Sequence, residues 1–188
     1  MKRVLVWCVR SAKVERDEDL IERINRGQAE AFERLYHRHR DWVYRLAWRF
    51  TGNQQDALDV AQETFVYLLK KFPGFRLTAS ITTFLYPVVK HLSLNTRRKR
   101  PAGSLDEAAL AEIPAPDPSE SSRAELAAAM ASLSSEQREV VLMRFLDGMS
   151  LDEIAASLDI PLGTAKSRLH NALRKLRGDV RTRAYFLE

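Results

Sequence analysis

The sequence predicts an all-α protein built from two small helical domains. The chain has 188 residues, a length that allows one domain or two small ones, and only seven residues are glycine. Alanine, leucine, arginine and glutamate are abundant, and alternating runs of β-branched residues are few, which favours helix over sheet. A stretch at 101–122 that is rich in proline and carboxylates separates a first domain, 1–100, from a second, 123–188.

Two helices are expected at the start of the first domain. The acidic residues at 17–19 suit the beginning of a short helix, and Gly27 suits its end. Apolar side chains then recur at helical spacing from Phe32 to Phe50. This second helix should end at a glycine-containing cap over 51–53.

Two further helices complete the first domain. The third is expected over about 56–72, with Leu58 and Phe65 among the residues that it buries. The fourth should run over about 80–98. Pro87 lies inside it and, because proline lacks a backbone N–H and clashes with the preceding turn, should kink or divide it.

The segment 101–122 is predicted to be a flexible, Pro-rich, acidic linker. It holds four prolines, which remove backbone donors and keep their neighbours out of the helical region. It also carries five carboxylates and no basic side chain, whereas residues 1–100 carry 20 basic and 11 acidic side chains. Positive charge gathers again at 164–188, with seven basic and two acidic residues, and such clustering is typical of contact with a phosphate backbone.

The second domain begins with helices expected over about 122–133 and 134–146. Ser150 and Glu153 then form the pattern of a capping box, in which each side chain bonds the other residue's backbone amide. The helix that follows should end in a turn at 159–163, where Asp159 tolerates a left-handed backbone. Pro161 can then begin the next helix, which is expected over 164–177.

The segment 150–177 therefore predicts a helix-turn-helix. Apolar residues of its second helix, such as Ala165 and Leu169, face inward, and the outward face carries cations, amides and hydroxyls that suit the major groove of DNA. The alternative is a helical hairpin with a solvated basic face. The outward residues are Lys166, Ser167, Arg168, His170, Asn171, Arg174 and Lys175.

Five stretches together resemble bacterial RNA polymerase sigma factors, specifically the small extracytoplasmic-function (ECF) group. Their order and spacing across a Pro-rich linker match that family over about residues 17–180. The stretches are Asp56-Ala-Leu-Asp-Val-Ala-Gln-Glu-Thr-Phe, Phe84-Leu-Tyr, Arg97-Arg-Lys-Arg, Leu151-Asp-Glu-Ile-Ala and Gly163-Thr-Ala-Lys-Ser-Arg-Leu-His.

The resemblance implies that each of the two domains binds a different element of a promoter. The helix-turn-helix would read the minus-thirty-five element, and the first domain would recognise and open the minus-ten element. The residues implied for the minus-thirty-five element are Arg144, Thr164, Lys166, Ser167, Arg168, His170, Asn171 and Arg174. Those implied for the minus-ten element are Phe75, Arg76, Ser80, Tyr86, Lys90, Arg97, Arg98 and Arg100. For Tyr86, as for Phe84, packing in the core competes with contact to an unstacked base.

The resemblance also implies protein partners. A polar face of the third helix, consisting of Asp59, Gln62, Glu63 and Val66, would dock on the coiled coil of the polymerase β′ subunit. The β flap, promoter DNA and an anti-sigma factor are the other implied partners, and the acidic linker would lie near the active-site channel of the polymerase. No cofactor, metal or membrane insertion is expected, and the cytoplasm is the expected location.

Other classes of function fit the sequence less well. No phosphate-binding glycine loop, zinc motif or nucleophile signature suggests an enzyme. Cys8 is the single cysteine, which excludes an internal disulfide, and His37 and His39 diverge on a helix and read as surface residues. The alternatives that remain open are a DNA-binding regulator that works without polymerase and an interaction protein derived from a sigma factor. The apolar arm Val4 to Val9 has no counterpart in the resemblance.

Overall fold

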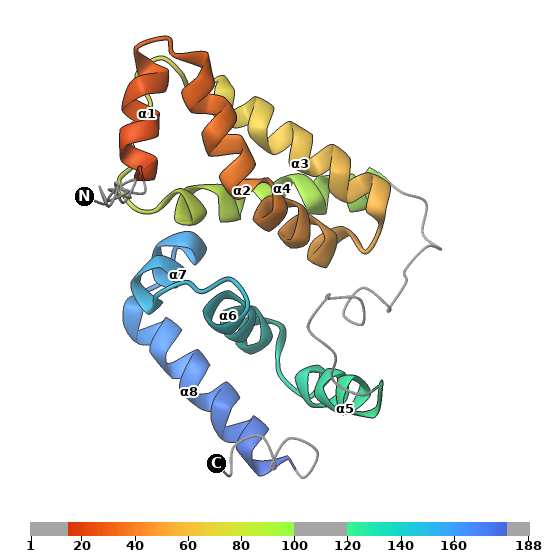
Figure 1. The fold of residues 1–188 in the computed structure, drawn as a ribbon. Helices are drawn as coiled ribbons and strands as arrows, with labels where there is room; N and C mark the ends of the chain where they lie inside the picture. The colour runs from red at the N-terminus through yellow and green to blue at the C-terminus, as the bar shows by residue number, and fades with distance from the viewer. Residues whose placement is uncertain (1–14, 100–119, 180–188) are drawn as a thin grey trace, which may run out of the picture.

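The computed structural model describes residues 15–99 and 120–179, and within these ranges all regular structure is α-helical, in eight helices (Figure 1). Helices α1 to α4 form one group, hereafter the first lobe, and α5 to α8 form a second lobe that lies against it (Figure 1). The all-α prediction is confirmed for these residues. The apolar N-terminal arm, Arg100 and most of the predicted linker lie outside the described residues.

The first two helices begin and end close to the predicted positions. Helix α1 spans Asp17–Asn25 with acidic residues in its first turn, and α2 spans Ala29–Thr51. Gly52 has a φ of 65°, and its amide donates to the carbonyl of Trp48 at 2.8 Å. A left-handed residue of this kind satisfies a carbonyl that the helix end would leave unpaired, and glycine adopts it without strain.

Helix α3 spans Gln54–Leu69, and one of its predicted core residues is exposed. The prediction that Leu58 is buried is wrong, since 47% of its surface is accessible. Apolar residues lie on more than one face of α3, and the face packed into the core holds Val60 and Leu68 instead. The helix also stops three residues before Phe72, which packs edge-on against Phe32 of α2.

Helix α4 spans Ile81–Lys99 as one undivided helix that includes Pro87. Proline at this position leaves the carbonyl of Thr83, four residues earlier, without its helical donor. The hydroxyl of Ser157 in the second lobe donates to that carbonyl at 3.4 Å. A contact from another element therefore replaces the helical bond that Pro87 removes.

The second lobe contains the predicted caps and turn. Its helices are α5 (Glu120–Ala131), α6 (Ser135–Phe145), α7 (Leu151–Leu158) and α8 (Leu162–Gly178). Ser150 accepts a bond from the amide of Glu153 at 3.2 Å, and the Glu153 carboxylate accepts from the amide of Ser150 at 2.8 Å. Asp159 has a φ of 52°, so the predicted capping box and left-handed turn are both confirmed.

The two lobes share one hydrophobic core. Leu85 and Val89 of α4 belong to the same buried cluster as Met143, Met149 and Ile154 of the second lobe. A smaller cluster, which includes Leu133, Ala172 and Leu176, packs α5 and α6 against α8. The arrangement described is therefore a closed one, in which α4 and α7 lie side by side (Figure 1).

The capping box at the start of α7 gives a first prediction. Replacing Ser150 with alanine removes the acceptor for the Glu153 amide and should lower the free energy of unfolding by about 1 kcal/mol. Chemical denaturation followed by circular dichroism measures the change. The variant Thr78→Ala alters an exposed loop residue and serves as the control with little expected effect. Equal midpoints for Ser150→Ala and the parent protein would show that the cap does not stabilise the fold.

Candidate nucleic-acid and protein interfaces

The outward face of α8 is a cationic and polar surface. Lys166, Ser167, His170 and Arg174 are exposed, while Thr164, Arg168 and Asn171 are half-buried. The inner face buries Ala165, as predicted, together with Ala172 and Leu176, while Leu169 is half-buried. The guanidinium of Arg174 donates to the amide oxygen of Asn171 at 3.2 Å, and the Ser167 hydroxyl donates to the Thr164 carbonyl at 3.0 Å. The face can therefore offer donors in a fixed arrangement to base edges and phosphates.

Arg144 lies at the end of α6 and supports the turn that precedes α7. Its guanidinium donates to the carbonyl of Met149 at 2.9 Å, and the side chain is otherwise exposed. This bond spans the loop between α6 and α7, which contains Gly148 with a φ of 70°. Donors that this bond does not use stay available to a phosphate.

Aromatic rings cluster where the loop 73–80 meets α4. The rings of Phe75 and Phe84 lie 4.8 Å apart, and Tyr67 of α3 stacks on Phe84 at 6.3 Å. Phe75 and Phe84 are half-buried, whereas Arg76 beside them is exposed. Phe84 therefore packs on its neighbours and also reaches the surface. Both alternatives that the sequence left open for this ring, packing in the core and contact with a base, are compatible with its position.

In the closed arrangement, carboxylates of the second lobe contact three residues predicted for the minus-ten element, namely Tyr86, Lys90 and Ser80. The phenol of Tyr86, 1% exposed, donates to Glu139 at 2.8 Å, and the ammonium group of Lys90 donates to the same oxygen at 2.5 Å. Burial, together with the negative charge of Glu139, raises the pKa of Tyr86 far above its usual range, so the phenol keeps the proton that it donates. Burial raises the pKa of Glu153, but hydrogen bonds from Ser80 and Ser150 outweigh it and leave this pKa below its usual value.

The end of α4 is strongly basic. Arg97, Arg98 and Lys99 are all exposed, and Arg97 donates to the carbonyl of Phe50 at 3.3 Å. Arg100, which the sequence adds to this group, lies outside the described residues. The three described cations form a surface suited to phosphates.

A buried ion pair joins the lobes at a point that the sequence did not indicate. The guanidinium of Arg49 meets the carboxylate of Asp147 with N to O distances of 2.7 and 3.3 Å. The two side chains are only 8% and 6% exposed. This pair adds to the directional contacts between the lobes that Glu139 makes with Tyr86 and Lys90 and that the Ser157 hydroxyl makes with Thr83.

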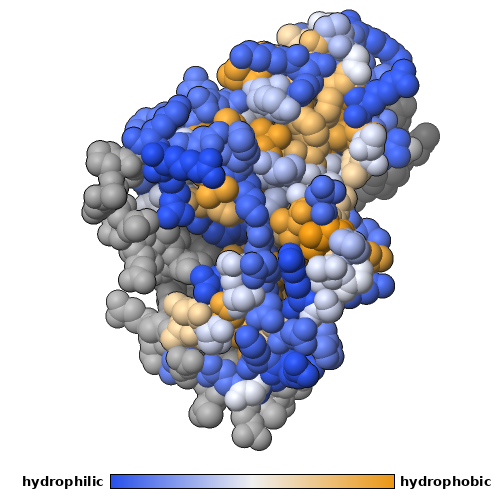
Figure 2. Space-filling model, turned by 180° about the vertical axis from the view of Figure 1, so that it is seen from behind, coloured by the Kyte–Doolittle hydropathy of each residue, from blue (hydrophilic) through white to orange (hydrophobic). Residues whose placement is uncertain are grey.

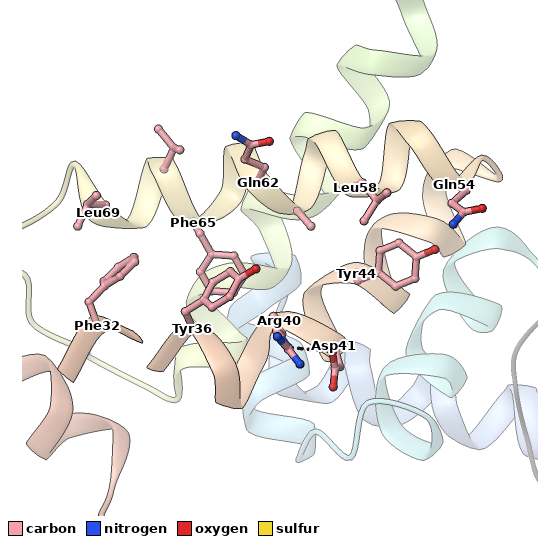
Figure 3. A pocket seen from close by; sticks show the side chains of 12 residues that line it. Phe32, Tyr36, Arg40, Asp41, Tyr44, Gln54, Leu58, Gln62, Phe65 and Leu69 are labelled. Carbon is pink, nitrogen blue, oxygen red and sulfur yellow. Dashed lines mark ion pairs between the residues drawn. The ribbon is translucent and has the colours of Figure 1, made fainter. Parts of the chain in front are cut away.

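The polar face predicted on α3 borders a hollow between α2 and α3. Asp59, Gln62 and Glu63 are exposed, and Val66 is 43% exposed. Gln62 and Val66 line the hollow, whose volume is about 510 Å³, while Asp59 and Glu63 do not (Figure 3). On the rear of the molecule, apolar patches interrupt a largely hydrophilic surface (Figure 2).

The residues on the opposite wall of the hollow were not predicted from the sequence. Phe32, Tyr36 and Tyr44 of α2 point toward α3 across it (Figure 3). Tyr36, which the sequence places in the apolar stripe of its helix, is 37% exposed. Aromatic residues at intervals of four and eight along one helix could have indicated this wall, but the same spacing is typical of a stripe of core residues.

The histidines have structural partners. His39 lies 2.8 Å from the carboxylate of Asp17, and His37 lies 3.6 Å from Glu33. Among the residues described, no group of three or more histidine, cysteine, aspartate or glutamate side chains could hold a metal ion. None of the described helices combines the length and the apolar character that crossing a membrane requires.

Comparison with protein families gives a match in each lobe. Residues 35–102 match the model of sigma-70 region 2, and residues 123–176 match that of sigma-70 region 4. The two matches together cover more than half of the chain, the first ending at residue 102 and the second beginning at residue 123, directly after the predicted linker.

Curated relatives extend over most of the chain. It is 36% identical over 158 residues to the ECF RNA polymerase sigma factor SigE of Mycolicibacterium smegmatis, covering 78% of this chain and 60% of that protein. It is 31% identical over 172 residues to the ECF RNA polymerase sigma-E factor of Escherichia coli, covering 83% of this chain and 90% of that one. The chain thus spans less than two thirds of the first relative but nearly the whole of the second.

Two solved structures resemble this one. A structure of CnrH in complex with the cytosolic domain of CnrY gives a TM-score of 0.64 at 25% identity, covering 86% of this chain and 95% of that one. A co-crystal structure of the sigma factor RpoE with the anti-sigma factor NepR from Bartonella quintana gives a TM-score of 0.61, covering 80% of this chain and 96% of that one. At 20% identity, the second likeness concerns the fold alone.

Proposed function

The chain belongs to the ECF group of RNA polymerase sigma factors, and from this membership we propose how its surfaces divide the recognition of a promoter. Proteins of this group direct promoter-specific initiation of transcription, and this protein is an initiation factor and not an enzyme. We assign residues 1–100 to a region 2-like domain, 101–122 to the linker and 123–188 to a region 4-like domain.

The outward face of α8 is proposed to read the minus-thirty-five element. Its exposed cations, hydroxyl and imidazole stand on a rigid helix whose other side is buried, which is the geometry of a recognition helix in the major groove. A good contact to a base edge supplies about 1–3 kcal/mol of discrimination. Arg144 and Thr164 would hold phosphates at the edge of this site.

The loop 73–80 and α4 are proposed to bind and open the minus-ten element. Unstacking a base costs free energy, which stacking on an aromatic ring and cationic contacts with the strand can offset. The half-buried Phe75, the exposed Arg76 and the basic end of α4 support this assignment. Ser80, Tyr86 and Lys90 would join the site once the second lobe moves away.

Core polymerase is proposed to bind at α3. Asp59 and Glu63 would meet basic groups of the β′ coiled coil, and the hollow beside Gln62 and Val66 would take its apolar side chains. A separate apolar surface at Phe145 and Leu146, which are 64% and 43% exposed, suits the β flap.

The proposal requires the two lobes to separate on a promoter. The two elements lie about 25 base pairs apart, which corresponds to about 85 Å of duplex at about 3.4 Å per pair. Lobes that share one core cannot span that distance. We therefore infer that the closed arrangement belongs to the protein away from DNA, acting in the cytoplasm with the polymerase. An anti-sigma factor, such as the partner in the RpoE co-crystal structure, is proposed as a regulator.

The observation that carries the function is the pairing of a region 2 match and a region 4 match on lobes with separate binding surfaces. Run-off transcription by core polymerase on a pool of genomic fragments, with and without this protein, tests it. Specific transcripts that need the protein are the expected result. A protein that binds DNA fragments but yields no new transcript would instead be a regulator that works without polymerase.

A further inference from the structure

One side chain from α1 holds the loop that joins α3 to α4. The amide oxygen of Asn25 accepts from the backbone amides of Gly74 at 2.6 Å and Phe75 at 3.1 Å. Its amide nitrogen donates to the carbonyl of Phe75 at 2.8 Å. Two partners are donors and one is an acceptor, so the pattern fixes which end of the side chain faces which group. A residue about 50 positions away in sequence thus satisfies three backbone groups of the loop.

The loop has a backbone that depends on such outside support. Gly74 has a φ of 100°, a conformation that residues with a side chain rarely adopt, and Pro73 contributes no N–H. Loop amides that no helix pairs must find other partners. Asn25 supplies them at the residue where the chain turns toward Phe75 and Arg76.

The position of Phe75 follows from this anchor. Asn25 bonds both backbone groups of Phe75, and the ring then packs against Phe72 at 5.4 Å and Phe84 at 4.8 Å. Arg76, the next residue, stays exposed. The direction in which the ring and the guanidinium leave the loop is therefore set by a side chain that need not touch DNA itself.

We propose that Asn25 is a positioning residue for selection of the minus-ten bases, acting through the loop 73–80. The proposal rests on the proposed function, in which this loop meets the opened strand. Asn25 lies outside residues 35–102, which match the region 2 model, so the match does not assign it this role. Loss of the anchor lets the loop sample other conformations, and a preorganised contact that becomes mobile loses selectivity before it loses all affinity.

The test measures base selection by the holoenzyme. Core polymerase with each variant is incubated with a library of single-stranded DNA oligonucleotides of randomised sequence, and the recovered strands are sequenced. Asn25→Ala removes all three bonds and should reduce the enrichment of the preferred bases at least about fivefold, which is the factor that a single hydrogen bond of about 1 kcal/mol contributes. Asn25→Asp keeps the acceptor for both amides and should lose less. Arg26→Ala, which removes an exposed neighbouring side chain, is the matched control.

Two further variants distinguish a wrong role for Asn25 from a wrong function for the loop. Gly74→Ala strains the loop backbone in open space and should reproduce the loss seen with Asn25→Ala. Arg76→Ala tests whether the loop meets DNA at all. If Arg76→Ala leaves selection unchanged, the proposed function of the loop is wrong. If Arg76→Ala weakens selection but Asn25→Ala does not, even with a lowered melting temperature, Asn25 is only structural and the proposal is overturned.

Discussion

Reversing the charge at Asp59 and Glu63 together is expected to weaken binding to core polymerase by at least about 100-fold. Both carboxylates are exposed on α3 beside the hollow, so lysine at these positions can be solvated and the fold should persist. In the proposed complex the new cations would face basic groups of the coiled coil, and like charges at an interface cost several kcal/mol. Titration of labelled variant with core polymerase measures the loss.

The control for this change is Glu30→Lys, which reverses an exposed charge near the start of α2. Circular dichroism of both variants should match that of the parent protein, and DNA contacts of the second lobe should be retained. Unaltered affinity of the Asp59→Lys, Glu63→Lys variant for core polymerase would show that α3 is not the docking surface.

Replacing Asp147 with alanine is expected to open the closed arrangement. The change leaves the Arg49 guanidinium without its carboxylate in a site where the side chain is 8% exposed. Removing one partner of a buried ion pair costs about 3–5 kcal/mol, because the remaining charge is desolvated without compensation. Separating the lobes returns Arg49 to water, so we expect the cost to appear as domain opening and a larger radius of gyration in X-ray scattering.

Opening should also expose the surface of α4 to DNA. Tyr86 and Lys90 would lose Glu139, and binding of single-stranded DNA by the free protein should rise. Asp152→Ala, which removes an exposed carboxylate of α7, is the matched control. The double variant Arg49→Ala, Asp147→Ala should open less than the single one, since it leaves no buried charge. Scattering and DNA binding that stay as in the parent protein would show that the pair does not hold the lobes together.

The sequence was sufficient to predict the features that depend on residues close together in the chain. The capping box at Ser150, the left-handed turn at Asp159 and the end of α2 at Gly52 depend on residues within one or two turns, and all are confirmed. Family resemblance supplied the two matched domains. The individual DNA-binding and polymerase-binding residues stay predictions.

The features that the sequence did not reveal depend on distant partners. Arg49 and Asp147 are 98 residues apart, and nothing near either one indicates that they are paired. Leu58 and Tyr36 follow the spacing of core residues, yet they border the hollow and are partly exposed. Pro87 was expected to kink or divide α4, which is undivided, and the sequence could not show that Ser157 would bond the carbonyl that Pro87 frees.

The contact between Lys90 and Glu139 affects how this protein responds to ionic strength. A lysine that binds DNA from solution usually displaces a condensed cation from a phosphate, which makes log affinity fall by about 0.9 per contact for each unit of log salt. When Lys90 leaves Glu139 for DNA, salt weakens the bond that it gives up as well as the bond that it gains. The two effects oppose each other, so we expect the affinity of this protein for DNA to fall less steeply with salt than the number of contacted phosphates alone would predict.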